Sequence, residues 1–350
     1  MKQMTARLVT QGLFALAVLA SVGCASKKGV TTMAATENEK AKTVEATAEE
    51  SAYLLAHFVG ESDIGEQLYF ALSTDGLHWH DTNGGKPVLV STIGTKGVRD
   101  PFITKSRIDG KYYIIATDLR IANGYGWGAA VREGSHSMVI WSSEDLVHWS
   151  EPWMYEVPLE HIGCVWAPEA IYDEARECYL VFWASFTKQG NDGKHIIYAS
   201  QTKDFRTFTA PVNYIERADH VIDTTIVQVG SVYYRFSKDE SANKSIIMDA
   251  GTDLLGTFTR VQSPSLDAVR GVEGPASYIL PDGRFCLLVD QFATGKGYLP
   301  LLTSDVASAE FTPAAPERYN LGTAKKRHGS VLKISKEAYE RMIAAFGVEQ

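Results

Sequence analysis

The sequence predicts an all-β fold, a five-bladed β-propeller, because two series of short motifs alternate along the chain. From about Tyr53 onward, short apolar β-type runs are separated by Gly, Asp and Asn, and helical periodicity is almost absent before the C-terminal end. A unit of pure β structure that returns about every 50–70 residues is typical of propeller blades.

The first series is a turn motif in which an aspartate precedes an aromatic residue. An Asp side chain caps a tight turn by accepting hydrogen bonds from backbone N–H groups, and the aromatic ring packs the turn against a neighbouring strand. The five copies are Ser73–Trp79, Ser143–Trp149, Thr202–Phe208, Gly251–Phe258 and Thr303–Phe311. One copy is an ordinary surface turn, whereas five copies indicate a repeat.

The second series is a polar residue that leads an apolar strand. Its five copies are Arg99–Ile103, Trp166–Ile171, Ile222–Val227, Val272–Tyr278 and Arg327–Leu332. Hairpin returns follow the first four copies and begin at Lys111, Cys178, Val232 and Arg284. Because the first strand of each blade lines the central channel, we expect five side chains around one axis: Asp100, Glu169, Asp223, Glu273 and His328.

The last blade lacks a hairpin after its first strand. Instead, Tyr339, Met342, Ile343 and Phe346 fall at helical spacing and predict a short C-terminal helix. We expect the N-terminal runs 53–59 and 67–72 to supply the missing strands, which removes free sheet edges.

We expect the chain to divide into an export signal (1–24), a disordered tether (25–50) and a propeller domain (51–350). The signal has a basic start, an apolar stretch from Leu13 to Val22 that is too short to span a membrane, and a small-residue segment before Cys24. The segment 19–24 resembles a lipobox, although Ser21 stands where Leu is usual. We therefore expect an exported bacterial lipoprotein, periplasmic or at the cell surface, with a lipid anchor on Cys24; cleavage nearby without lipidation is the alternative.

Composition excludes some partners. The formal net charge is −8 and the chain has no dense Lys/Arg stripe, so nucleic acid is not expected as a partner. Beyond Cys24 the cysteines are Cys164, Cys178 and Cys286, and their spacing matches no metal site. We expect buried free thiols, with one Cys164–Cys178 bridge as the alternative.

Four carboxylates that converge on one channel repel one another, and burial raises their pKa values. A fold does not need this arrangement. The acids either cap turns and pair locally with Arg99, Lys238 or Arg327, or they serve hydrolysis, with one carboxylate as base and one as acid, as in glycosidic bond cleavage.

The ordered combination Arg-Asp-Pro-Phe-Ile, Trp-Ala-Pro-Glu, Ile-Asp-Thr-Thr, Glu-Gly-Pro and Arg-His-Gly-Ser resembles glycoside hydrolase family 43, from about Tyr53 to the C-terminus. The resemblance implies a five-bladed propeller that inverts anomeric configuration. It also implies that Asp100 is the general base, that Glu273 is the general acid, and that Asp223 orients the acid and holds its pKa up.

The resemblance assigns further residues. His328 corresponds to a channel histidine that contacts a calcium ion at the axis, often through water, and no other cofactor is implied. Arg99, Arg327 and Trp166 are candidate substrate contacts, although Trp166 fits a core position equally well. Glu169 departs from the Asp that commonly ends its motif, and we expect it to contact substrate or framework.

The expected partner is an oligo- or polysaccharide, attacked from its end. An α-L-arabinofuranoside is the first choice, because it is the commonest substrate of the family, and β-xylosides and β-galactosides remain open. Specificity is expected in the loops 121–127 and 186–193, which also fit plain surface turns. A propeller that only binds glycans is the non-enzymatic alternative. Family 32 fructosidases are disfavoured because the sequence has neither their Asn-Asp-Pro-Asn-type nucleophile segment nor their Glu-Cys acid. Sialidases, which need an arginine triad and a tyrosine nucleophile, are disfavoured because the Asp75–Trp79 spacing is one residue shorter than theirs.

Overall fold

The computed structural model describes residues 51–187, 193–241 and 243–349. The predicted export signal, the tether and Cys24 lie outside the described residues, as does most of the 186–193 loop, so these expectations stay predictions. Of the helices in the described part of the chain, none has the length and apolar character needed to cross a membrane.

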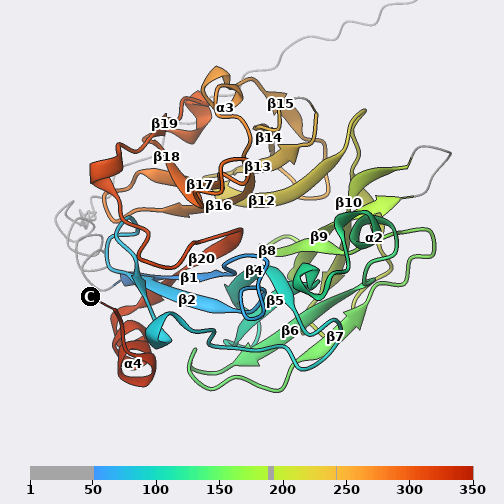
Figure 1. The fold of residues 1–350 in the computed structure, drawn as a ribbon. Helices are drawn as coiled ribbons and strands as arrows, with labels where there is room; N and C mark the ends of the chain where they lie inside the picture. The colour runs from blue at the N-terminus through green and yellow to red at the C-terminus, as the bar shows by residue number, and fades with distance from the viewer. Residues whose placement is uncertain (1–50, 188–192, 242, 350) are drawn as a thin grey trace, which may run out of the picture. The chain divides into compact units, whose positions relative to one another are not determined.

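Five four-stranded antiparallel sheets form the blades of a propeller, which confirms the predicted fold (Figure 1). Blade 1 contains β4 (Val98–Lys105), β5 (Tyr112–Asp118), β6 (Ser137–Ser143) and β7 (Trp153–Glu156). Blade 2 contains β8 (Trp166–Asp173), β9 (Cys178–Thr187), β10 (Lys194–Thr202) and β11 (Val212–Ile215). Blade 3 contains β12 (Val221–Val229), β13 (Val232–Asp239), β14 (Ile246–Gly251) and β15 (Thr259–Val261). Blade 4 contains β16 (Glu273–Ile279), β17 (Phe285–Asp290), β18 (Tyr298–Thr303) and β19 (Thr312–Pro313).

Blade 5 joins the two ends of the described chain. Its order is β20 (Gly329–Ser335), β1 (Ser51–His57), β2 (Tyr69–Ser73) and β3 (His80–Asp81). Strands β1 and β20 pair antiparallel, with Leu54 opposite Leu332. The first strands of the blades contact one another in a ring, β4 to β8, β12, β16, β20 and back to β4. The N-terminal strands therefore complete the last blade, as predicted.

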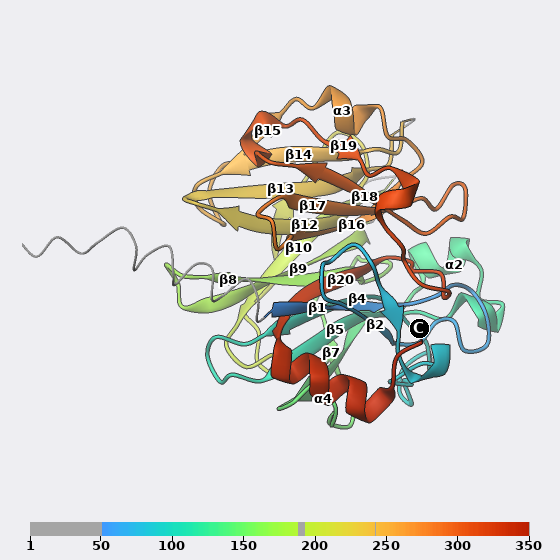
Figure 2. The same cartoon turned by 90° about the vertical axis from the view of Figure 1, so that its left-hand side faces the viewer.

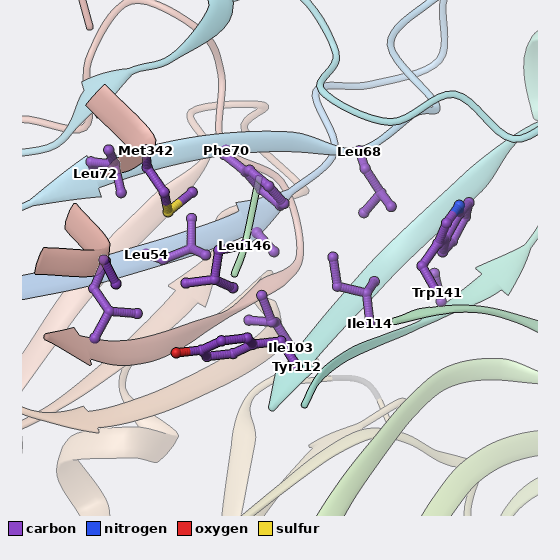
Figure 3. Packing of buried hydrophobic residues seen from close by; sticks show 14 of the residues in the cluster. Leu54, Leu68, Phe70, Leu72, Ile103, Tyr112, Ile114, Trp141, Leu146 and Met342 are labelled. Carbon is purple, nitrogen blue, oxygen red and sulfur yellow. The ribbon is translucent and has the colours of Figure 1, made fainter. Parts of the chain in front are cut away.

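The predicted C-terminal helix is α4 (Lys336–Phe346), which packs against β1 and β20 (Figure 2). The Ser335 side chain accepts a hydrogen bond from the Ala338 N–H at its start, and Gly347 follows its end. Met342 is fully buried in a cluster that also contains Leu54, Phe70 and Ile114, so α4 and the sheets of blades 1 and 5 share one core (Figure 3). Two shorter helices are α2 (Trp127–Arg132) and α3 (Pro264–Asp267).

The repeated aspartate caps its turn as expected. The Asp75 Oδ1 atom accepts the N–H groups of Leu77 and His78, both at 2.8 Å. Asp145 and Asp204 each accept two backbone N–H groups in the same way, and Asp253 and Asp305 each accept one. Cys164, Cys178 and Cys286 are buried free thiols, and the alternative Cys164–Cys178 bridge is not formed.

Candidate active site

The first strands of blades 1 to 4 share a local distortion where they enter the ring. The pairing register of each with its neighbour shifts at this point, and one residue there has a left-handed backbone: Asp100 (φ 50°), Ala167 (φ 46°), Asp223 (φ 48°) and Gly274 (φ 52°). Asp is among the few non-glycine residues that visit this region routinely, and a β-bulge re-aims a side chain. Two of the four candidate acids are thus themselves the bulge residues.

One cavity of about 930 Å³ collects the candidate site. Its lining includes seven of the eight residues singled out from the sequence: Arg99, Asp100, Trp166, Asp223, Glu273, Arg327 and His328. The eighth, Glu169, is buried and does not line the cavity. The volume lies at the upper end of the range of about 300–1,000 Å³ for sites of organic ligands.

Asp100 is held in its ionised form. The Thr117 hydroxyl donates a hydrogen bond to its Oδ2 at 2.9 Å, and the Nδ1 atom of His328 lies 3.4 Å from its Oδ1. Burial raises the pKa of Asp100, but His328, with help from Arg99 and Thr117, outweighs burial, so the net pKa lies below the ordinary 3.8. A buried carboxylate that stays charged suits a general base.

Asp223 lies in the opposite electrostatic environment. Burial, followed by the charges of Glu273 and Asp100, raises its pKa to about 6, against the opposing charges of His328 and Lys238. Its Oδ2 accepts the Gly274 N–H at 3.1 Å. This hydrogen bond connects Asp223 directly to the strand that carries Glu273.

His328 lies between these acids, with its Nδ1 3.8 Å from the Asp223 Oδ2. Burial alone lowers the pKa of His328, but Asp223, Asp100 and Glu169 outweigh it and raise the pKa to about 9. The ring is therefore an imidazolium at neutral pH and supplies the positive charge that the acidic ring needs.

The surroundings of His328 do not fit direct coordination of calcium. Calcium takes 6–8 oxygen ligands, and an imidazole ring offers only nitrogen. Among residues 51–187, 193–241 and 243–349, no group of three or more His, Cys, Asp or Glu side chains is arranged to hold a metal ion. A calcium ion held through water stays a prediction.

Two cationic side chains donate hydrogen bonds to Glu273. Lys238 Nζ donates to its Oε2 at 2.8 Å, and Arg327 Nη2 donates to its Oε1 at 2.9 Å. Each cation has a second carboxylate partner, Glu240 for Lys238 and Asp290 for Arg327. The sequence predicts Lys238 only as a local pairing partner of the acids. It does not predict Glu240 or Asp290, because they lie on other strands or loops than the motif that carries Glu273.

The two arginines are also committed to carboxylates. Arg99 Nη1 contacts Glu66 at 2.9 Å and Glu61 at 3.3 Å. Arg327 pairs with Glu273 and Asp290. Both side chains border the cavity and order its wall, and their contact with a substrate stays a prediction.

Glu169 lies deeper in the ring than the other acids. Burial, with a smaller push from Asp223, raises its pKa to about 8, although His328 and a hydrogen bond with Thr225 work against this rise. Glu169 is thus protonated at neutral pH. Its place behind the cavity wall supports the framework alternative rather than a substrate contact.

Aromatic side chains border the open part of the cavity. Trp166 is partly buried, stacks on His195 with ring centroids 5.3 Å apart, and meets Trp127 edge to face at 6.1 Å. His195, Trp127 and Phe292 line the cavity and were not among the predicted site residues. Trp127 closes the 121–127 loop, where a Gly- and Asn-rich run was the only available signal.

A family model described as a probable glycosyl hydrolase domain, related to family 43, matches residues 49–340. The chain belongs to this family. A probable glycosyl hydrolase domain therefore spans most of the chain.

Two kinds of relative are similar to this chain. An α-L-arabinofuranosidase of Bifidobacterium longum subsp. longum is 30% identical over 307 residues, which cover 72% of this chain and 29% of that protein. The chain thus spans less than a third of that relative.

An endo-1,4-β-xylanase from Bacteroides thetaiotaomicron has a TM-score of 0.54 at 14% identity, covering 80% of this chain and 93% of its own. A family 43 β-1,3-galactosidase has a TM-score of 0.53 at 11% identity, covering 78% and 92%. At these identities, the two solved structures support the fold alone.

Proposed function

We propose that the enzyme is an exo-acting, inverting glycoside hydrolase that releases terminal α-L-arabinofuranosyl units from plant-type polysaccharides or glycans. The observation that carries the mechanism is the presence of Asp100, Asp223 and Glu273 in one cavity, in three different electrostatic environments. The arabinofuranosidase relative supports the choice of sugar.

Asp100 acts as general base in this proposal. It takes a proton from a water molecule while the water oxygen bonds to the anomeric carbon, and the glycosidic C–O bond breaks on the opposite side. Glu273 gives its proton to the departing oxygen. In inverting enzymes the two carboxyl groups lie about 6.5–9.5 Å apart, which leaves space for the water.

Lys238 next to the acid has a second carboxylate partner, Glu240. A lysine ammonium only donates hydrogen bonds, so it cannot receive one from a protonated Glu273. Lys238 keeps its contact with Glu240 Oε1, at 2.5 Å, when Glu273 holds its proton. The buried Lys238 therefore does not depend on Glu273 alone for a carboxylate partner.

Asp223 orients the acid. Its hydrogen bond from the Gly274 N–H fixes the backbone next to Glu273, and a negative charge on Asp223 favours the protonated form of a neighbouring carboxyl group. β-Xylosidase or β-galactosidase activity on the same site, and glycan binding without catalysis, are the alternatives.

A panel of aryl glycosides tests the proposal. We expect hydrolysis of the α-L-arabinofuranoside, with β-L-arabinofuranose as the first product by NMR, and loss of hydrolysis in Asp100→Asn. Faster cleavage of the β-xyloside or β-galactoside would replace the assigned sugar. A retained anomer would overturn the base assignment, and glycan binding without any hydrolysis would leave a binding propeller.

A further inference from the structure

Trp127 differs from every other tryptophan of the protein. All seven tryptophans lie in the described residues, and Trp127 is the one that is exposed, with 45% of its surface accessible. An exposed indole leaves a large apolar surface in contact with water, so the protein loses the free energy that burying this surface would provide. Because Trp127 lines the cavity, a ligand in the cavity can cover this apolar surface.

The fold holds Trp127 in place. It begins α2, in the long connection between β5 and β6, and the fully buried Ala130 anchors this helix. The Arg99 guanidinium lies 5.0 Å from the centre of the Trp127 ring, and Trp166 packs against it at an interplanar angle of 85°. The ring is thus fixed before any ligand arrives, which lowers the entropy cost of binding.

The cavity has a buried reactive end and an open end. Asp223 and His328 are 7% and 4% exposed, whereas Trp127 is nearly half exposed. A volume of about 930 Å³ is large for one pentose ring, since sites for much larger organic ligands start at about 300 Å³. The cavity therefore has space for a second sugar ring, and Trp127 is the most exposed of the aromatic side chains that line it.

We propose that Trp127 is a stacking platform for a sugar ring of the leaving group, next to the arabinofuranosyl unit that is cleaved. The apolar C–H face of a sugar packs on an indole, as other flat ligands do. This inference rests on the proposed exo-acting function, because in an exo-acting enzyme every sugar beyond the reacting one belongs to the leaving group. Trp127 then determines specificity for oligomeric over simple glycosides.

The test compares a substrate that reaches Trp127 with one that does not. Methyl α-L-arabinofuranoside has no second ring, whereas α-1,5-arabinotriose and an arabinosylated xylotriose do. For Trp127→Ala we expect kcat/KM to fall on the order of tenfold on the better oligosaccharide, mostly through KM, and to stay within about twofold on the methyl glycoside. Trp127→Phe should recover part of the loss.

A matched control lies in the same loop. Tyr125 is 43% exposed but does not line the cavity, so Tyr125→Ala should leave the ratio of the two kcat/KM values unchanged. Equal losses on both substrates in Trp127→Ala, or no loss on either, would overturn the platform. A wild-type enzyme that hydrolyses none of the arabinofuranosides would instead overturn the proposed function, so the two failures are distinguishable.

Discussion

Two aspartates at equivalent strand positions acquire opposite character from their neighbours. Asp100 and Asp223 both occupy left-handed bulge positions, with 15% and 8% of their side-chain surface exposed. The pKa of Asp100 is lowered because His328, Arg99 and Thr117 outweigh burial, whereas that of Asp223 rises to about 6 because burial and two carboxylates dominate. Pairs of acids with pKa values pushed apart are a mark of acid–base sites.

Glu273→Gln tests the assigned acid. The variant keeps the shape of the side chain but has no proton to donate, and its effect therefore depends on the leaving group. We expect a loss on the order of 10²–10⁴ in kcat on oligosaccharides, whose leaving oxygen needs protonation, and a much smaller loss on dinitrophenyl glycosides. Steady-state rates on both substrates measure it, and similar losses on both would remove the acid assignment.

Glu169→Gln tests the buried proton. With its pKa raised to about 8, native Glu169 keeps a proton that the unfolded chain releases above its ordinary 4.5. The unfolded state binds fewer protons at this group in this window, so the contribution of Glu169 to wild-type stability falls as pH rises from about 4.5 to 8, by up to about 1.4 kcal/mol per pH unit. The neutral Gln should remove this dependence.

Urea unfolding at several pH values gives the measurement. The stability of Glu169→Gln relative to wild type should rise between pH 5 and pH 8, whereas the same change at the exposed Glu310 should leave the difference flat. A flat difference for Glu169→Gln would mean that the carboxyl group is ionised in the folded protein.

Sequence motifs located the acids but not their depth. Asp100 and Asp223 are the third residues of their strands, and Glu273 begins its own, whereas Glu169 is the fourth residue of β8. One step along a strand changes the depth and the direction of a side chain. The left-handed residue in β8 is Ala167 rather than the acid, and no feature of the sequence marks that shift.

At the scale of elements, the bulge at the start of β16 joins two strands of the site. Gly274 has a left-handed backbone, and a Cβ atom built on it would lie 2.5 Å from Cγ of His328. Only glycine allows the first strands of blades 4 and 5 to approach this closely.

Gly274→Ala should displace His328 and reduce both stability and activity. Gly230 is the matched control, because it is also left-handed, at φ 62°, but has open space around its Cβ position. Gly230→Ala reports the backbone cost alone, roughly 1–2 kcal/mol. We expect a larger loss of stability in Gly274→Ala and a fall in kcat that Gly230→Ala does not show; equal losses would exclude a steric role for the contact with His328.

At the scale of the whole molecule, the pattern of repeats was sufficient to predict ring closure. The strand that starts at Arg327 has no hairpin after it, and the N-terminus has extra strands. The N-terminal strands can therefore complete the last blade, and β1 pairs with β20 as expected. Contacts between distant polar residues carry no such signal. Asp81 and Lys326 form a buried ion pair across 245 residues of sequence, and neither belongs to a repeated motif.

This ion pair fixes the chain just before the site. The Oδ2 atom of Asp81 accepts the N–H groups of Thr323 and Ala324, both at 2.8 Å, while Lys326 Nζ bonds to its Oδ1. Arg327 and His328 follow directly, so blade 5 holds the loop that delivers them to the cavity.

Lys326→Met leaves Asp81 buried without its cation and should cost about 3–5 kcal/mol of unfolding free energy, because an uncompensated charge is expensive to bury. Asp81→Asn combined with Lys326→Met should cost less than Lys326→Met alone, because no net charge is left in the interior. The exposed pair Arg107–Glu174 is the control, and Arg107→Met should cost at most about 1 kcal/mol. Denaturant unfolding measures all three variants, and kcat of Lys326→Met should fall under conditions where the variant is still folded. If Lys326→Met were as stable and as active as Arg107→Met, the ion pair would have no part in closing the ring or in placing Arg327 and His328.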